Sequence, residues 1–201
     1  MFGLIDDQQI TKFFSGNKGV TIGDVQYPKS IFTLWSEAER NAIGIYEVTV
    51  DTTNKKDEQW YINTNVSYGV ESNKAVGSYG TATAKAHADS TYTNQDKTDG
   101  LIPDGKDVGD IKDRGLKYYL IQDIKKQAAG ILQETDWYIT RKSDAGTAVP
   151  SAVTTHRAAV RTKSNEMETA IDNAADVDAL AALYVYTDGE RPLGEFPVLE
   201  I

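Results

Sequence analysis

Two stretches decide the fold of this chain: residues 116–138 read LKYYLIQDIKKQAAGILQETDWY, and residues 150–161 read PSAVTTHRAAVR. In the first stretch, apolar residues recur every three or four positions, which is typical of one buried face of a helix. They are Leu116, Tyr119, Leu120, Ile124, Ala128, Ile131 and Leu132. From the second stretch onward, Val153, His156, Val160, Met167 and Ile171 recur at a similar helical spacing. The two patterns predict a helical hairpin.

The first helix is expected to end at Trp137-Tyr138, and Arg141 to Ala148 is expected to form an exposed loop. Pro150 suits the first turn of the second helix, because its missing N–H has no partner there in any case. Asp176 is expected to cap a short third helix. Residues 116–183 therefore form a predicted helical hairpin domain, and residues 184–201 form an extended tail.

The N-terminal part predicts a small α+β unit over residues 19–71. Ser36 and Glu39 have the spacing of a capping box, and Gly44 suits the end of the short helix that follows. Ile45 to Val50 has the composition of a strand, and residues 59–70 are expected to return as a second strand. Residues 1–18 are predicted to be an arm or a short helix.

Residues 72–115 are rich in Ala, Thr, Ser, Asp and Gly, and they are predicted to form an extended polar linker. Residues 81–88 alternate Ala with polar residues, which fits a thin strand or a tether, although a helix is also compatible with so much Ala. The predicted fold class is α+β: a small N-terminal α+β unit, a linker, and a C-terminal helical hairpin with a short third helix and an extended tail.

The composition excludes several classes of partner and of chemistry. The 201 residues carry a formal charge of −9, which disfavours non-specific binding to phosphate backbones, so no nucleic-acid partner is expected. The absence of cysteine excludes disulfides, thiolate catalysis and cysteine-ligated metals. Met1–Asp7 lacks the features of a signal peptide, and no apolar run approaches the roughly 18 residues of a membrane span, so no membrane partner is expected.

Catalytic and metal-binding patterns are weak. Asp104, Asp107, Asp110 and Asp113 recur every third residue, whereas calcium loops place ligands at alternate positions, so a solvated acidic loop is favoured over a metal site. His156 has no neighbouring ligand motif and is interpreted as a packing or surface residue. No phosphate-binding glycine loop or nucleophile motif is present. The sequence therefore predicts no cofactor, no metal and no enzymatic activity.

Two Trp-Tyr pairs, Trp60-Tyr61 and Trp137-Tyr138, are the most distinctive candidate binding residues. Such rings can stack on sugars or bases, anchor a protein interface, or fill a core. A core position is favoured for Trp60. Trp137 is expected to pack within the hairpin, at the end of the first helix. An ion pair across the loop is predicted between Asp136 and either Arg157 or Arg161.

The segment from Gly115 to Tyr186 resembles the C-terminal region of tail proteins of tailed bacteriophages, marine ones in particular. The likeness is carried by Leu-x-x-Thr-Asp-Trp-Tyr, followed by Pro-x-x-Val-x-x-(Tyr/His)-Arg-x-x-(Val/Leu)-Arg. The matching residues are Leu132, Thr135, Asp136, Trp137, Tyr138, Arg141, Pro150, Val153, His156, Arg157, Val160 and Arg161. His156 replaces the Tyr that is more usual there. Residues 27–45 are more loosely similar to the N-terminal part of such proteins.

The resemblance implies a structural component of a phage virion, in the tail, the baseplate or the tail-fibre attachment. Its partners would be other virion proteins and further copies of itself in a symmetric homo-oligomer, and it would be found in the virion tail and, during assembly, in the host cytoplasm. Two alternatives stay open: a tail-fibre assembly chaperone that is not retained in the virion, and a glycan-binding module that uses Trp60, Tyr61 and Tyr68. The candidate interface or packing residues are Trp137, Tyr138, Arg141, Arg157, Arg161, Trp60, Phe196 and Leu199.

Overall fold

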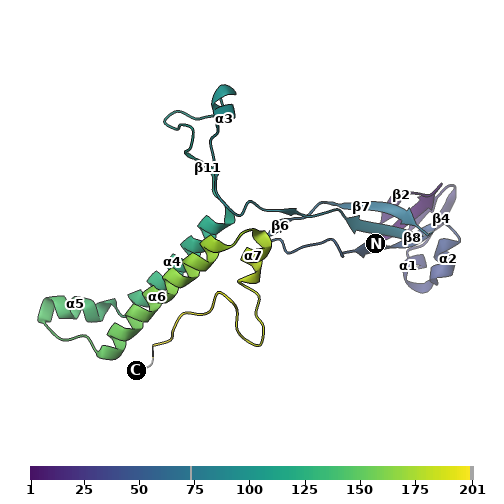
Figure 1. Ribbon diagram of the computed structural model, residues 1–201. Coiled ribbons are helices and arrows are strands. Elements are labelled where there is room, and N and C mark those ends of the chain that lie inside the picture. The colour runs from purple at the N-terminus through teal and green to yellow at the C-terminus, as the bar shows by residue number, and fades with distance from the viewer. Residues whose placement is uncertain (73, 200–201) are drawn as a thin grey trace. The chain divides into compact units, whose positions relative to one another are not determined.

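The computed structural model describes residues 1–72 and 74–199, and it confirms an α+β fold (Figure 1). The chain divides into two compact units, Met1–Thr83 and Ala84–Ile201. The strands of the main sheet all belong to the N-terminal unit, and the long helices all belong to the C-terminal unit. Among the described residues, no helix is both long and apolar enough to cross a membrane.

The N-terminal unit is built on a five-stranded sheet with the strand order β2-β1-β5-β8-β7. Its strands are β1 (Phe2–Asp6), β2 (Gln9–Phe14), β5 (Ile45–Asp51), β7 (Val66–Glu71) and β8 (Lys74–Tyr79). Neighbouring strands are antiparallel except for β5 and β8, which run parallel. The outer strands β2 and β7 also contact each other, because Phe13 and Tyr68 meet edge to face with ring centroids 4.9 Å apart. The sheet is therefore strongly curled.

The prediction of an arm or short helix over residues 1–18 is wrong, because residues 2–14 form the hairpin β1–β2. Asp7 and Gln8 both have positive φ angles, of 47° and 61°, as a tight two-residue hairpin turn requires. Asp7 is common at the first position of such a turn, but Gln8 replaces the Gly that usually follows, so the sequence signal for the turn was incomplete. β1 then pairs with β5 on its other side, which fixes it inside the sheet.

One core of this unit lies where the sheet meets the helix α1 (Ile31–Leu34) and the hairpin of β3 (Val20–Ile22) and β4 (Val25–Tyr27). Its buried members are Phe14, Val20, Ile31, Phe32 and Ile45. Ile31 and Phe32 belong to α1, and Val20 begins the small hairpin. The predicted capping box is confirmed at α2 (Glu37–Asn41), where the Ser36 N–H donates to Glu39 Oε2 at 2.7 Å.

The strand predictions after α2 are confirmed in outline. The strand expected at Ile45 to Val50 is β5, and the predicted return strand is divided into β6 (Tyr61–Ile62) and β7. β6 pairs with β9 (Thr83–Ala84), where the chain passes from one unit to the other.

The prediction that residues 72–115 form a linker is wrong for its first part, because β8 is an inner strand of the main sheet. The small residues of β8 explain why its sequence did not predict a strand. They also explain how β8 fits between β5 and β7. Ala75 is fully buried, and a Cβ atom at Gly77 would lie only 2.8 Å from the side chains of Val66 and Tyr68. The side chains of β7 therefore pack closely against Gly77, which has no side chain of its own to signal a buried strand.

Residues 90–113 form a narrow hairpin arm in the C-terminal unit. It contains β10 (Ser90–Thr91), α3 (Asn94–Thr98) and β11 (Ile111–Asp113), and the two strands pair antiparallel. Gly100, Gly105 and Gly109 all have positive φ angles and lie in the turns of this arm. The prediction of an extended linker is therefore wrong for these residues as well, because β10 and β11 pair with each other.

The predicted helical hairpin is formed by α4 (Leu116–Gln133) and α6 (Ser151–Asn173), which lie side by side in Figure 1. All five residues of the predicted apolar stripe on α6 are buried: Val153, His156, Val160, Met167 and Ile171. Asp176 caps α7 (Val177–Ala182) as expected, because its carboxylate accepts from the Ala179 N–H at 2.8 Å. The tail beyond α7 has no helix among its described residues, and Leu193 anchors it in the interior.

The predicted bounds of the first helix are wrong. α4 ends at Gln133, and a separate helix, α5 (Asp136–Ala145), occupies much of the expected loop over residues 141–148. Gly146 ends α5 in the left-handed conformation, with a φ angle of 67°. The Trp-Tyr pair therefore lies at the start of a new helix, so a different face of the chain points inward there.

Candidate interaction surface

The junction between α4 and α5 is held by one buried arginine of α6. The Arg157 guanidinium donates to the Leu132 carbonyl at 2.6 Å and to the Thr135 hydroxyl at 2.7 Å. It also forms an ion pair with Asp136, with an N–O distance of 2.8 Å. Leu132 lies in the last turn of α4, where backbone carbonyls lack partners within the helix. The Leu132 carbonyl also accepts from the Thr135 N–H at 3.1 Å and from the Thr135 hydroxyl at 3.0 Å. Arg157 thus links the end of α4 to the start of α5.

The predicted ion pair is confirmed for Arg157 and not for Arg161. Arg161 donates instead to the Arg157 carbonyl at 3.2 Å, one turn back on the same helix. The Asp136 side chain is largely exposed, whereas Arg157 and Thr135 are buried. The two hydrogen bonds from the Arg157 guanidinium to neutral, buried acceptors are therefore expected to contribute more to stability than the ion pair, since exposed pairs contribute under about 1 kcal/mol.

Trp137 does not pack inside the hairpin as predicted, because 52% of its surface is exposed. Its ring lies against Tyr138, with centroids 3.9 Å apart, and the Arg141 guanidinium lies 4.6 Å from the centroid of the indole ring. Ile139 is also exposed, by 44%. We call the residues Trp137, Tyr138, Ile139 and Arg141 the α5 surface. Trp137 is exposed because the helix is interrupted at Thr135, and this interruption changes which residues face α6.

The N-terminus of α4 is capped by the chain that precedes it. The N–H groups of Leu116 and Lys117 donate to the carbonyls of Ala86 and His87, at 2.9 and 3.0 Å. The Gly115 N–H donates to the Asp89 carboxylate at 2.8 Å, and this bond is the main reason that the pKa of Asp89 lies below its usual value. Residues 86–89 of the predicted linker are thus bound to the start of α4. α4 is held at its start by these residues and at its end by Arg157.

The other Trp-Tyr pair has the opposite environment. Trp60 and Tyr61 are both buried, with 6% and 9% of their surfaces exposed. The core position favoured for Trp60 is confirmed, so Trp60 offers no free face to a partner or a sugar. Of the three residues considered for glycan binding, only Tyr68 is exposed, and its ring contacts Phe13.

The two candidate residues of the tail are half-buried. Phe196 and Leu199 each keep part of their surface covered, whereas Val198 between them is 85% exposed. Among the described residues, Val198 is the most exposed of the large apolar side chains. The tail thus offers a second, smaller apolar element besides the α5 surface.

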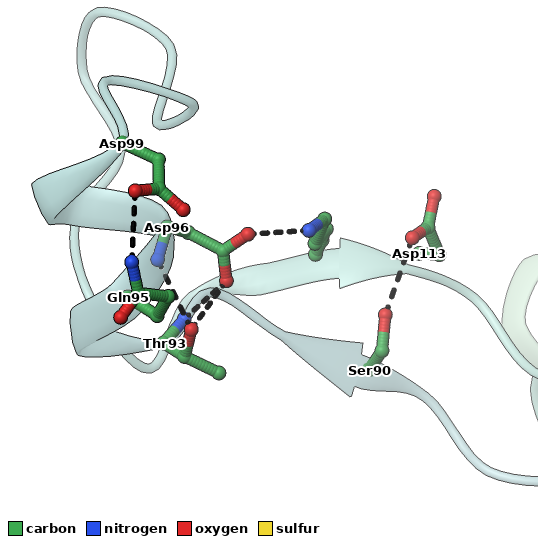
Figure 2. Close-up of polar contacts among 7 residues, drawn as sticks. Ser90, Thr93, Gln95, Asp96, Asp99 and Asp113 are labelled. Carbon is green, nitrogen blue, oxygen red and sulfur yellow. Dashed lines mark hydrogen bonds and ion pairs between the residues drawn. The ribbon is translucent and has the colours of Figure 1, made fainter.

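The hairpin arm contains a polar cluster that the sequence did not reveal (Figure 2). Thr93 and Asp96 form a capping box, in which the Thr93 N–H donates to Asp96 at 2.8 Å and the Thr93 hydroxyl donates at 2.6 Å. Lys112 of β11 forms an ion pair with the same carboxylate at 2.5 Å. The hydrogen bond from Lys112 and those from Thr93 hold the pKa of Asp96 far below its usual range. The cluster fastens α3 to β11.

The acidic residues of the arm bond to the arm itself. Asp107 forms an ion pair with Lys97 at 3.0 Å, and Asp110 accepts from the Asp107 N–H at 2.9 Å. In the part of the chain that the structure describes, no group of three or more His, Asp or Glu side chains could hold a metal ion. His156 is buried in the stripe of α6, which confirms its interpretation as a packing residue.

Comparisons with known proteins do not narrow the function further: no family model, no curated protein sequence and no solved structure matches this chain.

Proposed function

We propose that this protein is a structural component of a tailed-phage virion, in the tail, the baseplate or the tail-fibre attachment, and that it acts by protein–protein assembly in a symmetric homo-oligomer. The resemblance of residues 115–186 to phage tail proteins motivates the proposal. The observation that supports it best is the α5 surface. This surface exposes a tryptophan and an isoleucine on a helix whose position is fixed by Arg157.

A fixed, exposed aromatic surface is suited to binding a protein. Trp, Tyr and Arg are the residues most enriched at the energetic centres of protein interfaces, and here all three lie in contact with one another. Because Trp137 is already ordered by Tyr138 and Arg141, little side-chain entropy would be lost on binding. The α5 surface therefore has the composition and the order of an assembly contact.

Quantitative mass spectrometry of purified virions and of the lysate of infected cells tests whether the protein is a virion subunit, and at which copy number. A structural subunit is expected in the virion at a fixed copy number, near a multiple of three or six, since virion tails are symmetric. Absence from the virion together with abundance in the lysate would contradict the proposal and support the assembly chaperone instead.

The role of the α5 surface is tested by Trp137→Ala, with Tyr119→Ala as the matched control. Tyr119 is an equally exposed aromatic residue on α4 of the same unit. Virions produced with Trp137→Ala are expected to contain at least tenfold less of the protein, whereas Tyr119→Ala is expected to be incorporated normally. Equal incorporation of both variants would exclude the α5 surface as the assembly contact.

A further inference from the structure

A cavity of about 470 Å³ lies in the N-terminal unit, between the end of β2 and the start of β3. Its lining comes from residues 12–21, with the exception of Asn17. The volume falls within the range of known ligand pockets, roughly 300–1,000 Å³. We call it the β2–β3 pocket. None of its lining residues belongs to the α5 surface.

The pocket is cationic although the chain as a whole is strongly acidic. Lys12 and Lys18 contribute two ammonium groups, and no Asp or Glu is among the described residues that line it. Neither lysine has an ion-pair partner within residues 1–72 and 74–199, although the Lys12 ammonium lies 5.6 Å from the centre of the Phe14 ring. Two unneutralised cations at one hollow favour an anionic ligand.

The loop between the two lysines adds hydrogen-bond donors. Over the described chain, the backbone N–H groups of Gly16, Asn17 and Lys18 make no hydrogen bond to protein atoms. Gly16 has a φ angle of 76°, and successive N–H groups next to a left-handed residue commonly form an anion-binding concavity. The Ser15 hydroxyl donates to the Asn17 side chain at 2.6 Å, which orders the loop.

The pocket also has an apolar wall. Phe13 is 44% exposed, and Phe14 and Val20 belong to the core below it. A free inorganic anion would use only the polar part of such a site. A side chain that carries a carboxylate on methylene groups would contact both the ammonium groups and the aromatic wall.

We infer that the β2–β3 pocket binds carboxylate side chains of an acidic segment of a protein partner. Lys12 and Lys18 supply the opposite charge, the backbone N–H groups of Gly16 and Lys18 supply hydrogen-bond donors, and Phe13 supplies apolar contact. This inference goes beyond the proposed function and does not depend on the position of the protein in a virion, because the site and its ligand chemistry are properties of the N-terminal unit.

The test is a titration of the full-length ¹⁵N-labelled protein followed by NMR. The probe is acetylated, amidated hexaglutamate, and the matched neutral probe is the corresponding hexaglutamine. Saturable shifts of the Gly16, Asn17, Lys18 and Gly19 amide signals are expected with hexaglutamate alone, and they should weaken as salt is added. Inorganic phosphate at the same concentration is expected to produce much smaller shifts.

Two double variants locate the site. Lys12→Gln/Lys18→Gln is expected to weaken hexaglutamate binding at least tenfold. Lys29→Gln/Lys74→Gln removes the same charge from exposed positions outside the pocket and is expected to bind normally. All four lysines are exposed, so both variants should keep the melting temperature of the parent protein.

Three results would overturn the inference. The first is the absence of saturable shifts at Gly16–Gly19. The second is an equal loss of binding in the two double variants, which would indicate attraction to general positive charge. The third is tighter binding of phosphate than of hexaglutamate, which would identify a small-anion site instead.

Discussion

The two Trp-Tyr pairs of this protein have the same residues and opposite environments. Trp60 and Tyr61 are buried in the N-terminal unit, where the N–H groups of both residues donate to the Asp57 carbonyl in a tight turn. Trp137 and Tyr138 lie in the first turn of α5, and Trp137 is half exposed. A Trp-Tyr pair by itself therefore indicates a large apolar side chain, and not whether that side chain stabilises the fold or offers a contact.

The difference arises from what surrounds each pair. The turn at Asp57 directs Trp60 into the interior of its unit, whereas the break at Thr135 restarts the helix so that Trp137 points away from α6. Arg157 holds that break in place from another helix. The exposure of Trp137 thus depends on a residue 20 positions further along the sequence.

The largest expected effect is that of Trp60→Ala. Removing a buried indole leaves a cavity and should lower the free energy of unfolding of the N-terminal unit by about 3–5 kcal/mol. Denaturant titration followed by circular dichroism measures the change. Leu34→Ala is the control, since Leu34 is highly exposed and its loss should change stability little. A loss below about 1 kcal/mol for Trp60→Ala would show that the two pairs do not differ as described.

Arg157→Met should have the next largest effect. It removes one buried donor from the Leu132 carbonyl and one from the Thr135 hydroxyl, although the carbonyl keeps its hydrogen bonds from Thr135. The C-terminal unit should therefore lose about 1–3 kcal/mol of unfolding free energy, the contribution of hydrogen bonds from a charged group. The emission of Trp137 should also change, because the start of α5 is released. Arg161→Met is the matched control from the same helix and should cost under about 0.5 kcal/mol. Equal losses in both variants would reject the special role of Arg157.

Trp137→Ala should lower stability by under about 1 kcal/mol, since the substitution removes ring contacts at the surface without opening a cavity. Thermal unfolding of the purified protein measures this effect separately from incorporation into particles. A loss of 3 kcal/mol or more would place the ring in a core, as the sequence suggested, and would remove the contrast with Trp60.

The smallest effect is an acid dependence of the arm, which involves neither Trp-Tyr pair. The pKa of Asp96 is lowered on folding from its ordinary value of 3.8, so the stabilisation from its contacts is fully present above about pH 4 and is lost as the pH falls below that value. The pKa of Lys112 is raised, so its contribution is lost only above about pH 10.5.

Amide hydrogen exchange of residues 93–113 should therefore become faster below pH 4 than the intrinsic pH dependence of exchange predicts. Asp96→Asn should weaken this acid dependence and leave only the part due to Asp107, whose pKa is also lowered, chiefly by the hydrogen bond from Lys97. Asp104→Asn is a control from the same arm. The prediction would fail if the acid dependence were undiminished in Asp96→Asn, or if the emission of Trp60 changed over the same pH range.

The residues that sequence analysis placed correctly are those whose partners lie nearby in the chain. The capping box at Ser36 and the cap at Asp176 need partners three residues away, and the stripe of α6 needs only a regular helix. The predicted stripe of α4 is wrong at Tyr119, which is 57% exposed, although Ile124 and Ala128 are buried. The elements it missed need distant partners. β1 and β2 require β5, and β8 requires both β5 and β7. A short strand of small residues such as β8 carries too little local preference to be recognised before its neighbours are known.

The sequence by itself determined the α+β class, the helical hairpin, the acidic character and the capping residues, because charge, apolar periodicity and caps act over a few residues. Only the tertiary structure decided that residues 2–14 join a sheet, that the arm is a hairpin, and that Trp60 is buried while Trp137 is exposed. Burial is a property of the space around a side chain, and segments distant in the sequence fill that space. The same holds for the β2–β3 pocket: its lining lies within residues 12–21, but the cavity exists only because the strands on either side are fixed in place.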